Sequence, residues 1–185
     1  AVLDNEAVDT VILGTTGNQG IANAYIGRTL KTFTGRDIKV YIFTPRGTPE
    51  NKIREMKKYG AIVIDGERFD NYDEALRAAN VMAASEKYRN SSYFVDHAGI
   101  DAITSYAALG EAVLDSYRPQ GKFANTAIII PVGAGGLSSG IAVAAKRRNS
   151  ATQVFLVQSF RTRHAYESIK ADGIVEFVDS DQTSI

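Results

Sequence analysis

The sequence alternates between short runs of β-branched and aromatic apolar residues and longer amphipathic stretches. The runs are too short for helices and are apolar on both faces, which is typical of strands buried inside a parallel sheet. The stretches between them are long enough for helices that connect one parallel strand to the next. Right-handed connections place such helices on both faces, so we expect an α/β fold with a doubly wound parallel sheet.

The residue ranges of these elements follow from the pattern. Thr48 is an N-cap candidate with Pro49 at the first helical position, and Gly60, after Lys57 and Lys58, is typical of a helix end. Strands are expected at residues 8–13, 38–43, 61–64, 93–95, 126–130 and 154–157, with a further candidate at 175–178. Helices are expected at residues 18–30, 49–59, 71–88, 100–117, 137–147 and 164–172.

A first glycine-rich loop, GTTGNQG, covers residues 14–20 and follows the apolar run VIL. Glycine permits positive φ angles and close backbone approach, and the following helix presents unpaired N–H groups at its start. The loop is therefore a candidate anion site. A tight connection without any ligand would produce the same pattern, so this loop alone is a weak indication.

A second loop, PVGAGGLSSG, covers residues 131–140 and again joins a strand to a helix. Gly133, Gly135 and Gly136 are spaced for a concave nest of backbone N–H groups, and Ser138 and Ser139 add hydroxyl groups. No cationic side chain lies in this loop, so a phosphate would be held by the backbone.

Together the two loops resemble the signatures of the fold-type II pyridoxal-phosphate enzymes, the tryptophan synthase β-like group. Residues 15–20, TTGNQG, are similar to the family's Ser/Thr-x-Gly-Asn-His/Gln-Gly motif, and PVGAGGLSSG to its Pro-Val-Gly-Gly-Gly-Gly-Leu motif, with Ala134 replacing one glycine. The intervening PRGTPENKIREMKKYGAIVI also resembles the family. Members include threonine and serine dehydratases, threonine synthase and diaminopropionate ammonia-lyase.

This resemblance implies a role for each loop. Asn18 would face the phenolic oxygen of pyridoxal phosphate, and the first loop would bind the substrate carboxylate. The implied substrate-binding residues are Thr15, Thr16, Gly17, Asn18 and Gln19. The implied cofactor-binding residues are Asn18, Gly133, Ala134, Gly135, Gly136 and Leu137.

The lysine that forms the Schiff base in this family is expected in a Ser-x-Lys context before the first motif. The first lysine here is Lys31, which follows that motif, so no catalytic residue is assigned. The chain is thus expected to be a partial or truncated lyase-like protein that binds pyridoxal phosphate weakly or not at all and is inactive alone. We expect residues 1–118 to form a small α/β domain with the first loop. Residues 119–185 are then part of a larger cofactor domain.

A second interpretation remains open from the residues themselves. GxxGxxG after a first strand also resembles the NAD(P)-binding loop of atypical short-chain dehydrogenases and their regulator relatives, and Arg46 would suit a 2′-phosphate. The second loop has no role in that class, which favours the pyridoxal-phosphate reading. A non-catalytic α/β binding module is the remaining alternative.

Composition excludes several classes of function. The 21 basic and 21 acidic residues cancel, so no overall field favours nucleic acid or an anionic membrane. The absence of cysteine excludes disulfides and thiolate metal sites. No run approaches the roughly 20 apolar residues of a membrane span, and the N-terminus does not resemble a signal peptide. We expect a cytoplasmic protein that binds a small amino-acid-like ligand and forms a homo-oligomer.

The remaining polar residues suggest little additional chemistry. His97, in VDHAG, is near the expected substrate entrance, but a structural or surface role is favoured, and His164 is expected on a helix surface. A group of acids is interpreted as a solvated helix face rather than as a metal site. These acids are Asp65, Glu67, Asp70, Asp73 and Glu74.

Overall fold

The structure is a computed structural model that describes residues 2, 5–66, 68–116, 126–160 and 163–175. It divides into two compact units, unit 1 with Ala1–Val95 and unit 2 with Asp96–Asp179. The division lies earlier in the chain than the boundary expected at residue 118. The physical reason is that helix α4 (Ile100–Ser116) packs against helix α5 (Gly136–Arg148) and therefore belongs to unit 2.

Unit 1 contains a four-stranded sheet in the order β3-β2-β1-β4, and all neighbouring strands are parallel. Every residue of β1 is buried, as expected for a central strand of a parallel sheet. The strands are β1 (Thr10–Gly14), β2 (Lys39–Phe43), β3 (Ile62–Ile64) and β4 (Ser92–Phe94). The helices are α1 (Asn18–Thr34), α2 (Glu50–Lys58) and α3 (Tyr72–Ala84).

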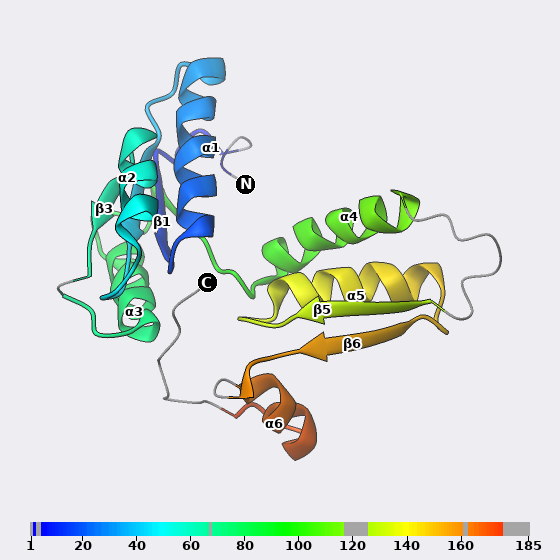
Figure 1. The fold of residues 1–185 in the computed structure, drawn as a ribbon. Coiled ribbons are helices and arrows are strands. Elements are labelled where there is room, and N and C mark those ends of the chain that lie inside the picture. The colour runs from blue at the N-terminus through cyan, green and yellow to red at the C-terminus, as the bar shows by residue number, and fades with distance from the viewer. Residues whose placement is uncertain (1, 3–4, 67, 117–125, 161–162, 176–185) are drawn as a thin grey trace. The chain divides into compact units, whose positions relative to one another are not determined.

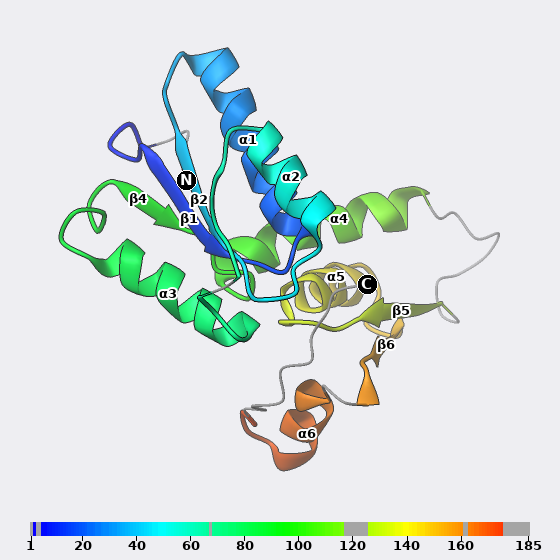
Figure 2. The same cartoon turned by 60° about the vertical axis from the view of Figure 1, so that its left-hand side comes forward.

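Helices cover both faces of this sheet (Figure 2). Val11 and Leu13 of β1 belong to one apolar cluster with residues of α1 and α2. Ile12 lies between them in sequence and belongs to a second cluster with alanines of α3. Alternate residues of a strand point to opposite faces, so one buried strand contributes to two cores. The predicted doubly wound α/β fold is confirmed.

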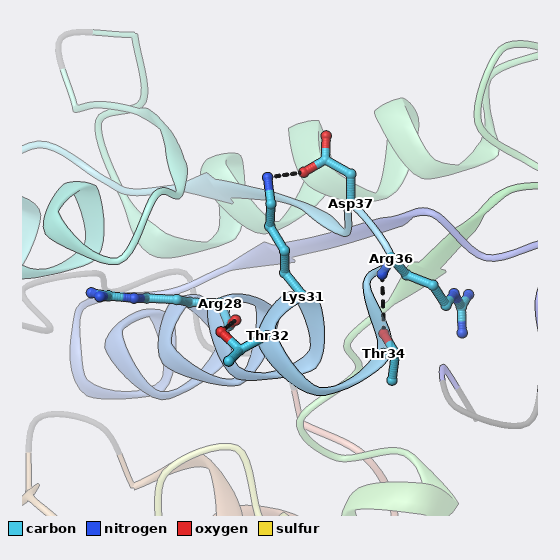
Figure 3. A network of polar contacts seen from close by, with 6 residues as sticks. All are labelled: Arg28, Lys31, Thr32, Thr34, Arg36 and Asp37. Atoms are coloured by element: carbon cyan, nitrogen blue, oxygen red, sulfur yellow. Dashed lines mark hydrogen bonds and ion pairs between the residues drawn. The ribbon is translucent and has the colours of Figure 1, made fainter.

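Polar contacts of Lys31, Thr34 and Arg36 surround the carboxyl end of α1 (Figure 3). Lys31 Nζ lies 2.6 Å from a carboxylate oxygen of Asp37, and this hydrogen bond lowers the pKa of Asp37. The Arg36 backbone N–H donates to Thr34 Oγ1 at 3.2 Å, and its guanidinium donates to the Val2 carbonyl at 2.9 Å. These contacts lie where α1 leads into β2, at the amino-terminal ends of the strands, whereas the first loop lies at their carboxyl ends.

Unit 2 contains a two-stranded parallel sheet of β5 (Ala127–Pro131) and β6 (Gln153–Val157). Helices α4 and α5 run alongside each other over one face of this sheet, and α6 (His164–Ala171) follows β6 (Figure 1). Ile128 and Val154 face this helix layer and pack against Leu114, Ala144 and Ala145.

Two glycines allow α4 and α5 to approach closely. A Cβ atom added at Gly110 would lie 2.8 Å from Ala144 Cβ. One added at Gly140 would lie 2.6 Å from the Ile103 carbonyl oxygen and 2.8 Å from the Ala107 nitrogen. Since the last two are backbone atoms, neither a rotamer change nor a small side-chain shift would relieve the contact.

Element boundaries differ from the expected ones by a few residues. Helix α2 begins at Glu50 with Pro49 as its N-cap, and the Thr48 hydroxyl donates to the Pro45 carbonyl, so the expected Thr48 cap is wrong. Gly60, with φ +87°, follows Tyr59, the C-cap of α2, which confirms the expected helix end. The segment 118–125 and most of the candidate strand 175–178 lie outside the described residues.

Candidate functional site

The first loop lies at the carboxyl end of β1, the strand between β2 and β4. The chain passes from β1 to β2 and β3 on one side and returns to β4 on the other, so the strand order reverses beside β1. In open parallel sheets, ligands bind at such a reversal, outside the carboxyl ends of the strands. We call residues 15–20 the asparagine loop; the Thr15 N–H continues the strand ladder by donating to the Phe43 carbonyl at 2.9 Å.

Backbone donors gather where this loop enters α1. Gly17 is the N-cap, with φ 152° and ψ −82°, and no side chain caps the helix. The first intrahelical bond runs from the Ile21 N–H to the Gly17 carbonyl at 3.1 Å. The N–H groups of Asn18, Gln19 and Gly20 precede it, and α1 has no acidic residue in its first turn. This arrangement favours a bound anion.

Thr15 holds the asparagine loop in its bent conformation. It is buried, and its Oγ1 accepts a hydrogen bond from the Gly17 N–H at 3.1 Å. A Cβ at Gly20 would lie 2.8 Å from Thr15 Cγ2 and 2.7 Å from Met56 Cε, so only glycine fits there. Thr15 therefore fixes the conformation of the loop. The backbone N–H donors of Asn18, Gln19 and Gly20 follow it in the chain, at the start of α1.

A cation from α2 lies beside the same loop. The Lys52 side chain crosses directly over Gly17, and its Nζ would lie 3.0 Å from a Cβ added there. The positive φ of Gly17 favours glycine at position 17, whereas the Lys52 side chain is flexible and could move aside. Lys52 is not among the site residues predicted from the sequence, because it follows the first motif and does not lie in the Schiff-base context. Its place in the segment that resembles the family was the available signal.

The second loop lies at the carboxyl end of β5, and we call residues 132–136 the glycine loop. The Val132 N–H donates to the Val157 carbonyl at 2.8 Å, which ties the start of the loop to β6. Gly135 is the N-cap of α5 in the left-handed conformation, with φ 97°. Its carbonyl accepts from the Ser139 N–H and from the Ser138 hydroxyl, both at 2.9 Å. The Ser138 hydroxyl therefore serves the helix start.

The glycine loop is packed on one side and open on the other. A Cβ added at Gly133 or Gly135 would have no atom within 4 Å, so the loop is open on that side. At Gly136 the opposite holds, because a Cβ there would collide with the His97 carbonyl oxygen. The loop is thus fixed on one side and open on the other. Its helix N-terminus has no acidic residue in the first turn.

Both histidines of the sequence contact this loop or its helix. The His97 carbonyl packs against Gly136 at the start of α5. His164 Nε2 lies 3.1 Å from the Gly133 carbonyl oxygen, and His164 is half-buried. His164 begins α6 and remains partly exposed there, as expected for a helix surface, and the contact with Gly133 is an addition to that expectation.

Three of the acidic residues of this region, Asp65, Asp70 and Glu74, have local partners. Asp65 lies 3.6 Å from Lys57, and Asp70 lies 3.2 Å from Arg46, the residue considered for a 2′-phosphate. Glu74 accepts from the Asp70 N–H at 2.8 Å at the start of α3. Within the described part of the chain no group of three or more His, Cys, Asp or Glu side chains could hold a metal ion. Nor does any helix described there have the length and apolarity of a membrane span.

Comparison with known proteins identifies the family of the chain. The family model for pyridoxal-phosphate dependent enzymes matches residues 1–184. An L-threonine ammonia-lyase of Geobacter sulfurreducens is 32% identical over 135 residues, covering 73% of this chain and 31% of the relative. A catabolic L-threonine dehydratase of Staphylococcus aureus is 28% identical over 197 residues, covering 97% and 51%. The chain spans about half the length of these relatives or less.

Solved structures show the same fold. A pyridoxal 5′-phosphate-dependent aspartate racemase has a TM-score of 0.77 at 24% identity, covering 96% of this chain and 49% of that one. Threonine deaminase isoform 2 of Solanum lycopersicum has a TM-score of 0.76 at 22% identity, covering 96% and 45%. The dinucleotide alternative is not supported, although Tyr166 and Lys170 on α6 have the Tyr-x-x-x-Lys spacing of short-chain dehydrogenases. The chain belongs to the family of pyridoxal-phosphate-dependent enzymes.

Proposed function

We propose that this chain forms part of an enzyme that uses pyridoxal phosphate to deaminate a small amino acid with a β-hydroxyl or another β-substituent. The observation that carries the proposal is the pair of bent glycine-rich loops, each opening a helix at the carboxyl end of parallel strands. The threonine ammonia-lyase and dehydratase names of the relatives support β-elimination as the reaction class.

The two loops have separate tasks in this proposal. The N–H groups at the start of α1 hold the substrate carboxylate, and Asn18 faces the cofactor's phenolic oxygen. The glycine loop, with Ala134 and Leu137, holds the cofactor phosphate by its backbone. When bound, pyridoxal phosphate supplies the electron sink for negative charge that develops at the substrate α-carbon. Unit 1 then corresponds to the smaller domain and unit 2 to part of the cofactor domain.

The carboxylate site combines three sources of positive potential. The first-turn N–H groups of α1 point toward the loop, the helix dipole adds to them, and Lys52 brings an ammonium group beside Gly17. Such a site orients an amino acid by its carboxylate and leaves its β-substituent directed elsewhere. This orientation is what elimination from the β-carbon requires.

The first prediction concerns covalent capture of the cofactor. No lysine precedes the asparagine loop in this sequence, so the 185-residue chain tested alone should bind pyridoxal phosphate weakly and reversibly. After treatment with pyridoxal phosphate and borohydride, mass spectrometry should show no stoichiometric adduct, and serine and threonine should release keto acid only at the background rate. An adduct on one lysine, together with keto-acid release, would show that a lysine within this chain does the chemistry.

The second prediction concerns assembly, and we propose that the chain forms homo-oligomers. On the sheet face of unit 2 opposite α4 and α5, Ile129 is 70% exposed, and Phe155 and Val157 are about half exposed. Parallel sheets are ordinarily covered on both faces, and an exposed apolar face promotes association. Light scattering should therefore give the mass of a dimer or larger species, and replacing Phe155 with serine should reduce it. A monodisperse monomer would contradict this part of the proposal.

The remaining parts of the proposal concern ligand class and setting. The ligand is a small amino-acid-like anion, because the donors at each loop are few and local. The cancelling charges of the sequence give no field that would attract nucleic acid, and we propose a cytoplasmic location consistent with the absence of cysteine.

A further inference from the structure

The imidazole ring of His164 is bonded on two sides within unit 2. Its Nε2 lies 3.1 Å from the carbonyl oxygen of Gly133 in the glycine loop. The side-chain nitrogen of Gln158, directly after β6, lies 3.4 Å from each ring nitrogen. The ring therefore connects the start of α6 and the end of β6 to the glycine loop.

The partners determine which ring nitrogen carries the proton. A carbonyl oxygen only accepts, so His164 Nε2 must donate to Gly133. The Gln158 Oε1 accepts from the Ala165 N–H at 3.1 Å, which leaves the amide nitrogen facing the ring. That nitrogen only donates, and since Nε2 already donates to Gly133, Nδ1 is the ring nitrogen that can accept from it. The neutral ring with its proton on Nε2 satisfies both neighbours.

This hydrogen bond also sets the direction of the next backbone donor. The described residues include no cis peptide bond, and in a trans peptide the C=O and N–H groups point in opposite directions. With the Gly133 carbonyl held toward His164, the Ala134 N–H must point away from the ring. A Cβ at Gly133 would meet no atom within 4 Å, so side-chain packing at this position does not restrain the peptide.

We propose that His164 is a positioning residue of the phosphate site. By holding the Gly133 carbonyl, it directs the Ala134 N–H into the open side of the glycine loop, where that group binds a phosphate. The inference rests on the proposed function, which assigns a phosphate group to this loop. The phosphate group of a monoester and inorganic phosphate offer the same anionic oxygens to this loop, so inorganic phosphate is a sufficient probe.

The experiment compares three variants of the full chain with the wild type. His164→Leu removes the donor, and His164→Gln places an amide nitrogen near the position of Nε2. Tyr166→Leu is the control, because Tyr166 is 59% exposed on the same helix. Backbone amide signals of ¹⁵N-labelled protein are followed during titration with inorganic phosphate, and folding is checked by the melting temperature.

We expect saturable shifts at residues 134–137 in the wild type, with phosphate affinity about three- to tenfold weaker in His164→Leu, the range of one lost hydrogen bond. His164→Gln should recover most of the affinity, and Tyr166→Leu should equal the wild type. In phosphate-free wild type, the ring ¹⁵N spectrum should show the proton on Nε2, a readout that does not depend on any variant folding.

The possible failures can be told apart. A proton on Nδ1, unchanged affinity in His164→Leu, or no recovery in His164→Gln would overturn the role of His164 while leaving the phosphate site in place. Absence of phosphate-induced shifts at residues 134–137 in the wild type would overturn the proposed function, and the role of His164 with it.

Discussion

Replacing Gly140 with valine will lower the free energy of unfolding of unit 2 by about 3 kcal/mol or more, the upper range for overpacking a close contact. The new Cβ would lie 2.6 Å from the Ile103 carbonyl oxygen and 2.8 Å from the Ala107 nitrogen. Both atoms belong to the backbone of α4, so the two helices must move apart. Hydrogen exchange of α4 and α5 amides measures the effect within unit 2.

The matched control is Ser139→Val, one residue earlier on α5. Ser139 is exposed, so its replacement adds the same β-branched side chain to the helix without a buried contact. We expect the control to change stability by less than about 1 kcal/mol. Equal losses in the two variants would mean that α4 and α5 do not pack through Gly140.

Replacing Ala134 with aspartate will reduce the phosphate affinity of the glycine loop by about tenfold or more. Two unit charges 4 Å apart interact by about 1 kcal/mol in water and about 4 kcal/mol near a protein surface, where the effective dielectric constant is lower. Ala134 is exposed beside two glycines with open space around them, so the new side chain should not disturb folding. Titration with inorganic phosphate measures the change.

Ser150→Asp controls for the added charge. Ser150 is exposed in the turn after α5, at the other end of the same helix. Its carboxylate should leave phosphate affinity nearly unchanged, because interactions beyond about 8–10 Å are screened at ordinary ionic strength. If both variants lose affinity equally, phosphate responds to net charge and does not bind at the glycine loop.

The fold could be predicted because its main determinants are local. Each strand of the two sheets is a short apolar run, and the helices between them are long enough to connect parallel strands. The end of α2 was predictable as well, since Gly60 takes a positive φ that favours glycine. By contrast, the N-cap of α2 was not predictable, because the Thr48 hydroxyl bonds to the preceding turn at Pro45, and the local sequence does not determine the direction of that hydroxyl.

Features that depend on distant parts of the chain were not predictable in the same way. The unit boundary after Val95 follows from the packing of α4 against α5 through Gly110 and Gly140, which no local pattern of prolines or polar residues reveals. Likewise, His164 reaches Gly133 only because the chain turns back after β6. Residues that contact the two loops from other elements are therefore the part of the site that requires a structure.

The most direct test of the central claim is an amide NMR titration of the chain with pyridoxal phosphate, pyridoxal and NADPH. Pyridoxal phosphate should shift the backbone signals of residues 133–137 and the side-chain amide of Asn18. Pyridoxal lacks the phosphate and should bind much more weakly, because the backbone N–H groups of the glycine loop have no anion to hold. Tight binding of NADPH that shifts residues 14–20, with no response of residues 133–137 to pyridoxal phosphate, would contradict the assignment of the two loops.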